Sequence, residues 1–368
     1  MRLLICAGGT GGGVYPALAV QQAVADRVEQ TLWVGGKGGM EADMIARAGI
    51  RFTEISAAGV HGVGLAALPG NLVKLARGYS QSRRILRDFQ PDVLLFTGGY
   101  VAVPMALAGA GVRTLLYVPD IEPGMALKAL ARFADVIALT DESSRKFFSK
   151  TKKMVVTGYP KREELRRVPR EQALRAFDFS SELPVLLVIG GSKGAHSLNL
   201  AIFENLASLL QKTQVLHLTG QLDWEEARLK KRSLDAGLEA RYQPYPYLHE
   251  EMSAAFSCAS LVLSRAGAST LGELPFYGLP ALLVPYPYAW RYQKVNADHL
   301  AQTGAAVIVE NAELSSRLDA LVGRLLSDSQ RLSAMGEKMS KLAAPAAAQK
   351  IADLLVQLAA GQGNERNA

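Results

Sequence analysis

The chain of 368 residues twice repeats one pattern, in which an apolar strand runs directly into a glycine-rich turn that opens a helix. The first copy is Leu3–Ala7 with the glycines of residues 8–13, and the second is Val185–Ile189 with those of residues 190–194. Glycine lets backbone N–H groups approach an anion, and a helix start adds partial positive charge. Pro16 suits the first turn of the first helix. The pattern predicts two α/β units with phosphate-binding turns, although tight packing alone also favours such glycines.

Short strand-like runs alternate with helix-like ones along the whole chain, as in parallel, doubly wound sheets covered on both faces. We therefore expect an α/β fold of two Rossmann-like domains facing a cleft, residues 1–157 and 158–342, and a helix at 343–360. The charged residues 161–183 are interpreted as hinge and connection. The expected strands are Arg2–Cys6, Thr31–Val34, Phe52–Ile55, Val93–Phe96, Thr114–Val118, Val136–Leu139, Pro184–Ile189, Gln214–Leu218, Ala240–Gln243, Leu261–Leu263, Ala281–Val284 and Ala306–Val309.

Two familiar nucleotide-binding motifs do not fit these turns. A dinucleotide fingerprint beginning at Gly9 needs glycine at position 14, where the chain has Val14. A nucleoside-triphosphate loop needs Gly-Lys followed by Ser or Thr, and neither Gly36-Lys37-Gly38 nor Ser192-Lys193-Gly194 supplies it. The turns therefore indicate a phosphate ligand of another class.

The composition of the chain indicates where the protein works and which kinds of partner it can bind. Hydrophobic residues make up 49% of the chain and charged residues 20%, and no apolar run reaches the ~18 residues of a spanning helix, so a cytoplasmic protein is expected. Cys6 and Cys258 lie in or beside apolar segments and are interpreted as reduced core residues. The net charge of +7 favours an anionic partner, either phosphorylated substrates or an anionic membrane surface. Nucleic acid is the least supported, because the basic residues are dispersed.

The segment His61–Phe89 mixes apolar and basic side chains. Such a helix can lie in an anionic membrane interface, with its basic groups toward the head groups. It can equally bury its apolar face in the protein and leave a solvated basic face. The apolar residues are Val63, Leu65, Leu68, Leu72, Val73 and Leu75, and the basic ones are Lys74, Arg77, Arg83, Arg84 and Arg87.

A further candidate site follows the expected strand at 261–263. The small residues and hydroxyls between Ser264 and Glu273 suit a diphosphate, and Glu273 could accept hydrogen bonds from ribose hydroxyls or simply complement the helix dipole. Arg162 is a candidate phosphate or nucleobase partner, or an exposed arginine without a role. No His/Cys/Asp/Glu cluster has metal-ligand spacing, so we expect the diphosphate charge to be met by N–H groups and basic side chains, without a metal or cofactor.

These motifs resemble the MurG family, the GT-B-fold transferases that move N-acetylglucosamine from UDP-GlcNAc onto undecaprenyl-diphospho-muramoyl-pentapeptide. The resemblance covers nearly the whole chain. The matching residues are Gly8-Gly9-Thr10-Gly11-Gly12 with Pro16-Ala17-Leu18-Ala19, Met40-Glu41, Pro91-Asp92-Val93, Gly98-Gly99-Tyr100-Val101, Pro104, Gly190-Gly191-Ser192, Gly194-Ala195, Ser264-Arg265-Ala266-Gly267-Ala268 through Glu273, Gly278-Leu279-Pro280-Ala281, Pro285, Gln293 and Asn296-Ala297.

The resemblance implies the reaction and its residues. The acceptor sugar's 4-hydroxyl attacks the anomeric carbon in one inverting displacement, and the enzyme is peripheral at the cytoplasmic face of the membrane. The acceptor's diphosphate is expected at Thr10, Gly11 and Gly12, and the terminal helix is expected to pack back on the first domain. The residues expected around UDP-GlcNAc are Arg162, Ser192, a backbone group near Leu248, Ala268, Ser269, Thr270, Leu271, Gly272, Glu273 on the ribose, and Gln293.

Three departures from the family pattern bear on the chemistry. Gly13 stands where a histidine usually follows the first glycine turn, and Asp120 stands where an asparagine usually contacts the donor. Tyr288, Trp290 and Tyr292 interrupt the segment before Asn296. We hypothesise that Asp120 or His61 replaces the missing histidine as general base, the alternative being that both are ordinary exposed side chains. A related transferase with another lipid-linked acceptor and a catalytically degenerate UDP-sugar-binding protein remain open.

Overall fold

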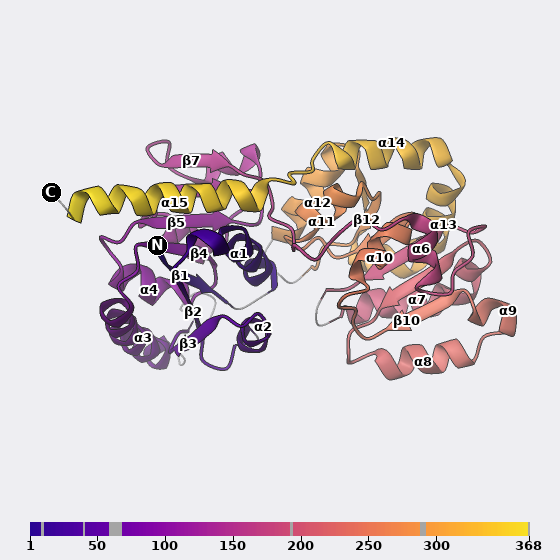
Figure 1. The fold of residues 1–368 in the computed structure, drawn as a ribbon. Coiled ribbons are helices and arrows are strands. Elements are labelled where there is room, and N and C mark those ends of the chain that lie inside the picture. Colours follow the sequence, from indigo (N-terminus) through magenta and orange to yellow (C-terminus); the bar gives the residue numbers. More distant parts are fainter. Residues whose placement is uncertain (9–10, 40, 59–67, 192–193, 288–291, 367–368) are drawn as a thin grey trace. The chain divides into compact units, whose positions relative to one another are not determined.

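The computed structural model describes residues 1–368 except 9–10, 40, 59–67, 192–193, 288–291 and 367–368 (Figure 1). The chain divides into two compact units, unit 1 with Met1–Arg162 and Ala344–Ala368, and unit 2 with Glu163–Ala343. The sequence analysis expected these divisions after residues 157 and 342. Within the described part of the chain, no helix is long and apolar enough to cross a membrane.

Unit 1 is built on a seven-stranded parallel sheet in the order β3-β2-β1-β4-β5-β6-β7. Its strands are β1 (Arg2–Ala7), β2 (Gln30–Gly36), β3 (Arg51–Ile55), β4 (Val93–Gly98), β5 (Thr114–Val118), β6 (Val136–Leu139) and β7 (Lys153–Val156). Its helices are α1 (Gly11–Val24), η1 (Ala25–Arg27), α2 (Glu41–Arg47), α3 (Leu68–Phe89), α4 (Ala102–Ala108), α5 (Met125–Leu130), η3 (Glu142–Phe147) and α15 (Ala347–Arg366).

Unit 2 repeats this plan with six parallel strands in the order β10-β9-β8-β11-β12-β13. Its strands are β8 (Val185–Ile189), β9 (Gln214–Leu218), β10 (Tyr242–Tyr245), β11 (Leu261–Ser264), β12 (Ala281–Leu283) and β13 (Ala306–Ile308). Its helices are α6 (Arg170–Arg175), α7 (His196–Leu210), α8 (Trp224–Arg232), α9 (Ala236–Glu239), α10 (Met252–Cys258), α11 (Thr270–Tyr277), α12 (Tyr292–Gln302), η4 (Asn311–Glu313), α13 (Leu314–Ser327) and α14 (Ser329–Ser340).

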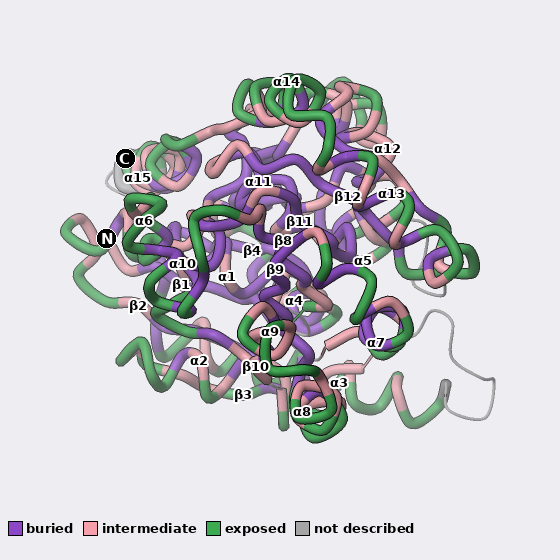
Figure 2. Tube along the Cα trace, turned by 90° about the vertical axis from the view of Figure 1, so that its right-hand side faces the viewer, coloured by how far each residue is buried: buried purple, intermediate pink, exposed green. Residues whose placement is uncertain are grey.

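The continuous apolar runs of the sequence form the central strands because helices cover both faces of each sheet. Every residue of β4, β5 and β9 is buried, and Figure 2 shows buried strands inside more exposed helices such as α8. In each sheet the strand order reverses beside the first strand, β1 or β8, as in a doubly wound fold. The predicted pair of Rossmann-like domains is therefore confirmed.

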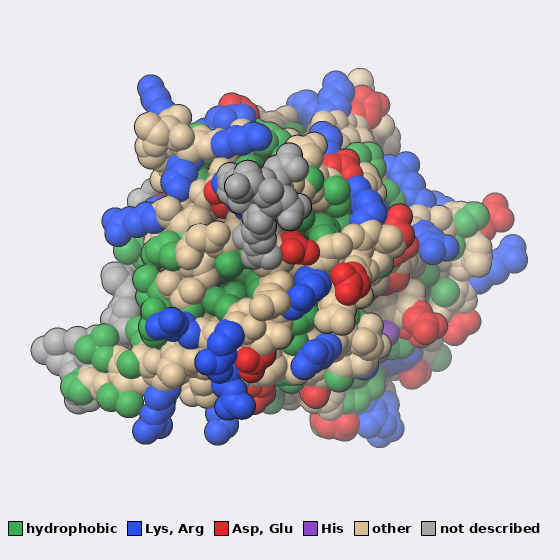
Figure 3. Space-filling model, turned by 60° about the vertical axis from the view of Figure 1, so that its left-hand side comes forward, with side chains coloured by type: hydrophobic (Ala, Val, Ile, Leu, Met, Phe, Trp, Pro, Cys, Tyr) green, Lys and Arg blue, Asp and Glu red, His purple; other side chains and the backbone are tan. Residues whose placement is uncertain are grey.

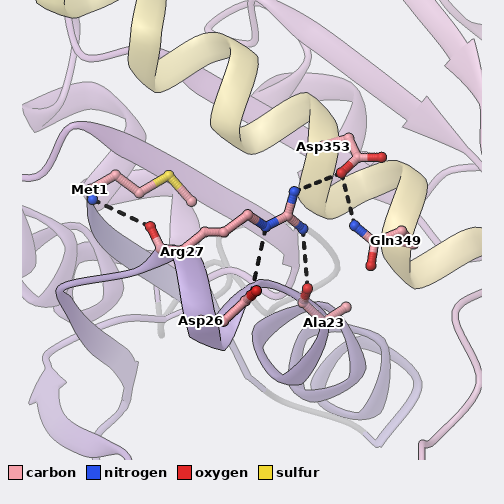
Figure 4. A network of polar contacts seen from close by, with 6 residues as sticks. All are labelled: Met1, Ala23, Asp26, Arg27, Gln349 and Asp353. Carbon is pink, nitrogen blue, oxygen red and sulfur yellow. Dashed lines mark hydrogen bonds and ion pairs between the residues drawn. The ribbon is translucent and has the colours of Figure 1, made fainter.

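The last helix, α15, belongs to unit 1. Ile351, Ala352 and Leu355 are fully buried in the same apolar cluster as Val14 and Val20 of α1. Arg27 Nη1 also donates to Asp353 Oδ1 at 2.7 Å, and Arg27 Nη2 to the Ala23 carbonyl at 3.1 Å (Figure 4). The helix begins and ends later than the expected range of residues 343–360.

Three local expectations were wrong. Helix α1 begins at Gly11, so Pro16 lies inside the helix and not in its first turn. The stretch at 161–183 is not only a connection, because from Glu163 on it belongs to unit 2, where it forms α6 and buries Leu174 and Phe177. Strand β7 was not predicted at all.

Candidate active site

At the carboxyl edge of the unit 1 sheet, β2 and β4 end in glycines and β1 is followed directly by Gly8. A cavity of about 80 Å³ lies there, lined by Gly8, Gly36, Lys37, Gly38, Gly39, Glu41, Ala57, Gly99, Tyr100 and Val101. Ligands of open α/β sheets bind outside the carboxyl ends of the strands, next to the point where the strand order reverses. The cavity lies beside β1, which is the strand at that point.

Glu41 is a buried residue that contacts the glycines at this edge. Its side chain is 1% exposed, and Oε1 accepts a hydrogen bond from the Gly36 N–H at 2.9 Å. A Cβ atom at Gly8 or Gly39 would overlap the Glu41 carboxylate, so a larger residue at either position would force this side chain to move. The sequence analysis noted Glu41 only as part of a motif, because spacing does not reveal that a charged side chain turns inward.

The start of α1 carries the predicted residues Gly11 and Gly12. Helix α1 opens at Gly11, and the first N–H groups of a helix have no partner within it, so they are available to an anion. Gly13 packs on β4, where Thr97 Oγ1 donates to the Gly13 carbonyl at 2.7 Å and a Cβ at Gly13 would lie 3.3 Å from the Thr97 carbonyl oxygen. A side chain here would have to displace that strand end slightly.

Two more predicted residues lie in unit 1. Asp120 is half-buried in the loop after β5, and its charge contributes to the raised pKa of buried Tyr117, for which burial is the main cause. The Arg162 guanidinium lies 4.8 Å from the ring centroid of Tyr15 in α1. The cation–π contact places Arg162 beside the helix that begins at the glycine turn.

In unit 2 the glycine turn after β8 packs against the end of β9. Gly191 and Gly194 have φ of +95° and +80°, which favour glycine, and a Cβ at Gly194 would overlap the Thr219 carbonyl. Helix α7 follows at His196. Three polar side chains next to this turn form a hydrogen-bonded chain. In it, His217 Nε2 contacts Asn199 Oδ1 at 2.9 Å and Asn199 Nδ2 donates to Asp223 Oδ2 at 2.6 Å.

The turn after β11 has its own set of backbone donors. The N–H groups of Thr270, Leu271, Gly272 and Glu273 all donate to carbonyls of residues 267–269, at 2.9–3.1 Å. Those of Gly267, Ala268 and Ser269 donate to no described residue. The donors left for an anion therefore lie just ahead of α11, and all three belong to the stretch from Ser264 to Glu273 that was predicted to bind a diphosphate.

The other predicted donor-side residues also lie at this edge of unit 2. Glu273 is 8% exposed in the first turn of α11. Gln293, near the start of α12, uses Oε1 to accept from the Tyr286 N–H at 2.9 Å, which fixes the chain after β12. Leu248 is buried in the segment after β10. Thr10, His61 and Ser192 lie outside the described residues.

In the comparison with known proteins, the two units match the two domains of one glycosyltransferase family. The Glycosyltransferase family 28 N-terminal domain matches residues 3–139, and the Glycosyltransferase family 28 C-terminal domain matches residues 185–353. The crystal structure of Acinetobacter baumannii MurG is 28% identical, with a TM-score of 0.77, and covers 97% of this chain and 99% of that one.

Curated relatives extend this match at higher identity. The "UDP-N-acetylglucosamine--N-acetylmuramyl-(pentapeptide) pyrophosphoryl-undecaprenol N-acetylglucosamine transferase" of Roseiflexus sp. (strain RS-1) is 38% identical over 97% of this chain and 95% of its own length. This chain belongs to the MurG family. The MurG-family transferase of the same description from Desulforudis audaxviator (strain MP104C) is 37% identical over 99% of this chain and 100% of its own.

As a MurG-family chain, it is a glycosyltransferase of the GT-B fold, with the expected glycine turns at the carboxyl edges of both sheets. The departures at Gly13 and Asp120 lie on described elements of unit 1. The one at Tyr292 is the first residue of α12, whereas those at Tyr288 and Trp290 fall outside the described residues.

Proposed function

We propose that this chain transfers N-acetylglucosamine from UDP-GlcNAc to the 4-hydroxyl of undecaprenyl-diphospho-muramoyl-pentapeptide. The observation that carries the proposal is the similarity to MurG-family transferases across both units, at 34–38% identity and over 94–99% of this chain. Each unit also brings a glycine turn to the carboxyl edge of its sheet, where a phosphorylated ligand fits.

Unit 2 is assigned to the donor. The N–H groups of Gly267, Ala268 and Ser269 would hold the diphosphate, and buried Glu273 would accept from the ribose hydroxyls. Gln293, a backbone group near Leu248 and Ser192 are assigned to the same donor.

Unit 1 is assigned to the acceptor. The N-terminus of α1, with Thr10, Gly11 and Gly12, would bind the acceptor's diphosphate, beside the cavity that Glu41 shapes. The cavity, at about 80 Å³, is too small for the whole acceptor. The remainder of the acceptor would extend outside it.

The reaction we assign to these ligands is a single inverting displacement. A bond forms from the acceptor 4-oxygen to the anomeric carbon as the bond from that carbon to the phosphate oxygen breaks, and the electron pair leaves with UDP. The hydroxyl proton passes to a general base, for which Asp120 and His61 are the candidates. N–H groups and basic side chains would balance the charge that develops on UDP, and no metal or cofactor is assigned.

Helix α3 supports a peripheral position on the cytoplasmic face of the membrane. Leu72 and Val73 are 54% and 51% exposed, and Lys74 and Arg77 are exposed beside them. Figure 3 shows Lys and Arg side chains next to hydrophobic ones along the lower edge of the face toward the viewer. Apolar side chains with flanking cations bind anionic lipid surfaces.

The test of the proposed reaction is transfer of labelled N-acetylglucosamine to a soluble analogue of the lipid-linked acceptor, in the presence of EDTA, by wild type and by Glu273→Ala. We expect wild-type product in EDTA and a raised KM for UDP-GlcNAc in the variant. Transfer by Glu273→Ala with wild-type kinetics would remove the ribose role. Product that disappears with EDTA and returns with a divalent cation would remove the metal-independent mechanism.

A further inference from the structure

Arg265 is a buried cation at the carboxyl edge of the unit 2 sheet. It follows Ser264, the last residue of β11, and is 8% exposed. Burying a charge costs free energy unless an opposite charge or several hydrogen bonds compensate for it. The partners of this guanidinium therefore indicate what it is for.

All of these partners are neutral. Arg265 Nη1 donates to the Val284 carbonyl at 3.0 Å and Nη2 to Ser197 Oγ at 2.6 Å, and the guanidinium carbon lies 5.4 Å from the ring centroid of Tyr286. Within the described part of the chain, no carboxylate forms an ion pair with Arg265. Burial lowers the pKa of Arg265 to about 10, so the side chain keeps its positive charge at neutral pH.

The partners belong to separate elements of unit 2. Ser197 lies in the first turn of α7, behind the glycine turn after β8, and Val284 follows β12. Gln293 of α12 holds the next part of the same segment through the Tyr286 N–H. Arg265 therefore joins the loop ends after three neighbouring strands, which form the edge assigned to the donor.

The backbone donors without partners begin two residues after Arg265. The N–H groups of Gly267, Ala268 and Ser269 donate to no described residue. Successive unpaired N–H groups form an anion site, and a nearby cation without a counter-ion makes its potential more positive. The same edge thus has both the shape and the charge that an anion needs.

We infer that Arg265 is a positioning residue for the donor diphosphate. Its guanidinium holds together the ends of β11 and β12 and the start of α7, and its unneutralised charge makes this edge prefer a nucleoside diphosphate to the neutral nucleoside. The inference rests on the proposed function for the identity of the donor. Its charge preference is measured without any transfer reaction.

The experiment compares the affinities for UDP and uridine, measured by competition against labelled UDP with no acceptor present. In Arg265→Met, UDP affinity should fall about 10- to 100-fold and uridine affinity less than about threefold, because the variant loses a nearby charge. Arg265→Lys should keep most of the preference for UDP, since the charge remains. The matched control is Arg170→Met, in which the lost guanidinium binds the Cys258 carbonyl and Ser260 Oγ, just before β11 at the opposite edge of the sheet.

Equal losses for UDP and uridine in Arg265→Met, or no loss for either, would overturn the inference while leaving the transferase proposal standing. Circular dichroism reports whether that variant folds. If it does not, Arg265→Lys decides, because a folded lysine variant without a preference for UDP would exclude the charge as its cause. A wild-type chain that binds neither UDP nor UDP-GlcNAc would overturn both proposals.

Discussion

His217 shows how one buried residue makes the stability of unit 2 depend on pH. Burial lowers its pKa to about 3, and the nearby charge of Asp223 opposes this only in part. The neutral ring accepts at Nδ1 from the Tyr242 hydroxyl and donates at Nε2 to Asn199 Oδ1, both at 2.9 Å. Protonation would place a second proton on Nδ1, so the bond to Tyr242 would have to reverse, with the hydroxyl oxygen as acceptor.

In the unfolded chain this histidine takes up a proton as the pH falls below about 6.5, whereas in the folded chain it does so only below about pH 3. The stabilisation is therefore complete above pH 6.5 and is lost as the pH falls, by about 1.4 kcal/mol per unit for this one group. We expect His217→Gln to reduce the slope of unfolding free energy between pH 6 and pH 4.5, roughly by one proton. The exposed His249→Gln is the control, and equal slopes in His217→Gln and wild type would contradict this account.

A second prediction for a single residue concerns Asp120 and the chemical step. If it takes the proton from the acceptor hydroxyl, Asp120→Asn should lower kcat by about 100- to 10,000-fold and change the KM for UDP-GlcNAc little. His61→Ala is measured beside it, because His61 is the other candidate. Losses below about tenfold in both variants would remove the general-base hypothesis.

At the scale of elements, the contacts of α15 allow the contribution of apolar packing to stability to be compared with that of a surface ion pair. Ile351 is fully buried in the core of unit 1, whereas the Arg27–Asp353 ion pair has side chains 30% and 48% exposed. Hydrogen bonds from Arg27 and Gln349 lower the pKa of Asp353, but water screens such a pair. Ile351→Ala should therefore lower the free energy of unfolding by about 2–5 kcal/mol and Asp353→Asn by less than about 1 kcal/mol, as measured by denaturant titration. Comparable losses in the two variants would be inconsistent with docking by apolar burial.

Helix α3 allows a test of membrane binding without a loss of fold, because Leu72 and Val73 point to solvent. The Leu72→Ser/Val73→Ser double variant should sediment with phosphatidylglycerol vesicles about tenfold less than wild type, since two apolar side chains no longer enter the lipid. Leu229→Ser, at a leucine 64% exposed on α8, is the matched control. Undiminished binding by the double variant would exclude α3 as the contact, and equal wild-type binding to uncharged vesicles would exclude a role for its cations.

The elements that sequence predicted best are the buried central strands. β5, β6 and β9 match their expected bounds from end to end, since continuous apolar runs between turns have few alternatives. β7 was missed because it is a short edge strand with no fully buried residue. β10 lies two residues later than expected and contains Pro244, which an edge strand tolerates.

Across the whole molecule, one topological rule predicted where the two glycine turns lie. A strand followed by glycines and a helix must present its turn at the carboxyl edge of a parallel sheet, so both turns could be placed without coordinates. The supporting residues could not be found in this way. The role of Arg265 depends on its contact with Ser197, and the role of Glu41 depends on the contact of its carboxylate with two glycine turns. Neither contact can be inferred from the spacing of residues along the chain.

The most direct test of the proposed reaction measures two products together. Purified chain is mixed with UDP-GlcNAc and the lipid-linked muramoyl-pentapeptide, and both released UDP and N-acetylglucosamine on the lipid are quantified, with and without acceptor. A transferase of the assigned kind yields equal amounts of both, and only when the acceptor is present. UDP released without acceptor, or an unmodified lipid despite bound UDP, would contradict the assignment.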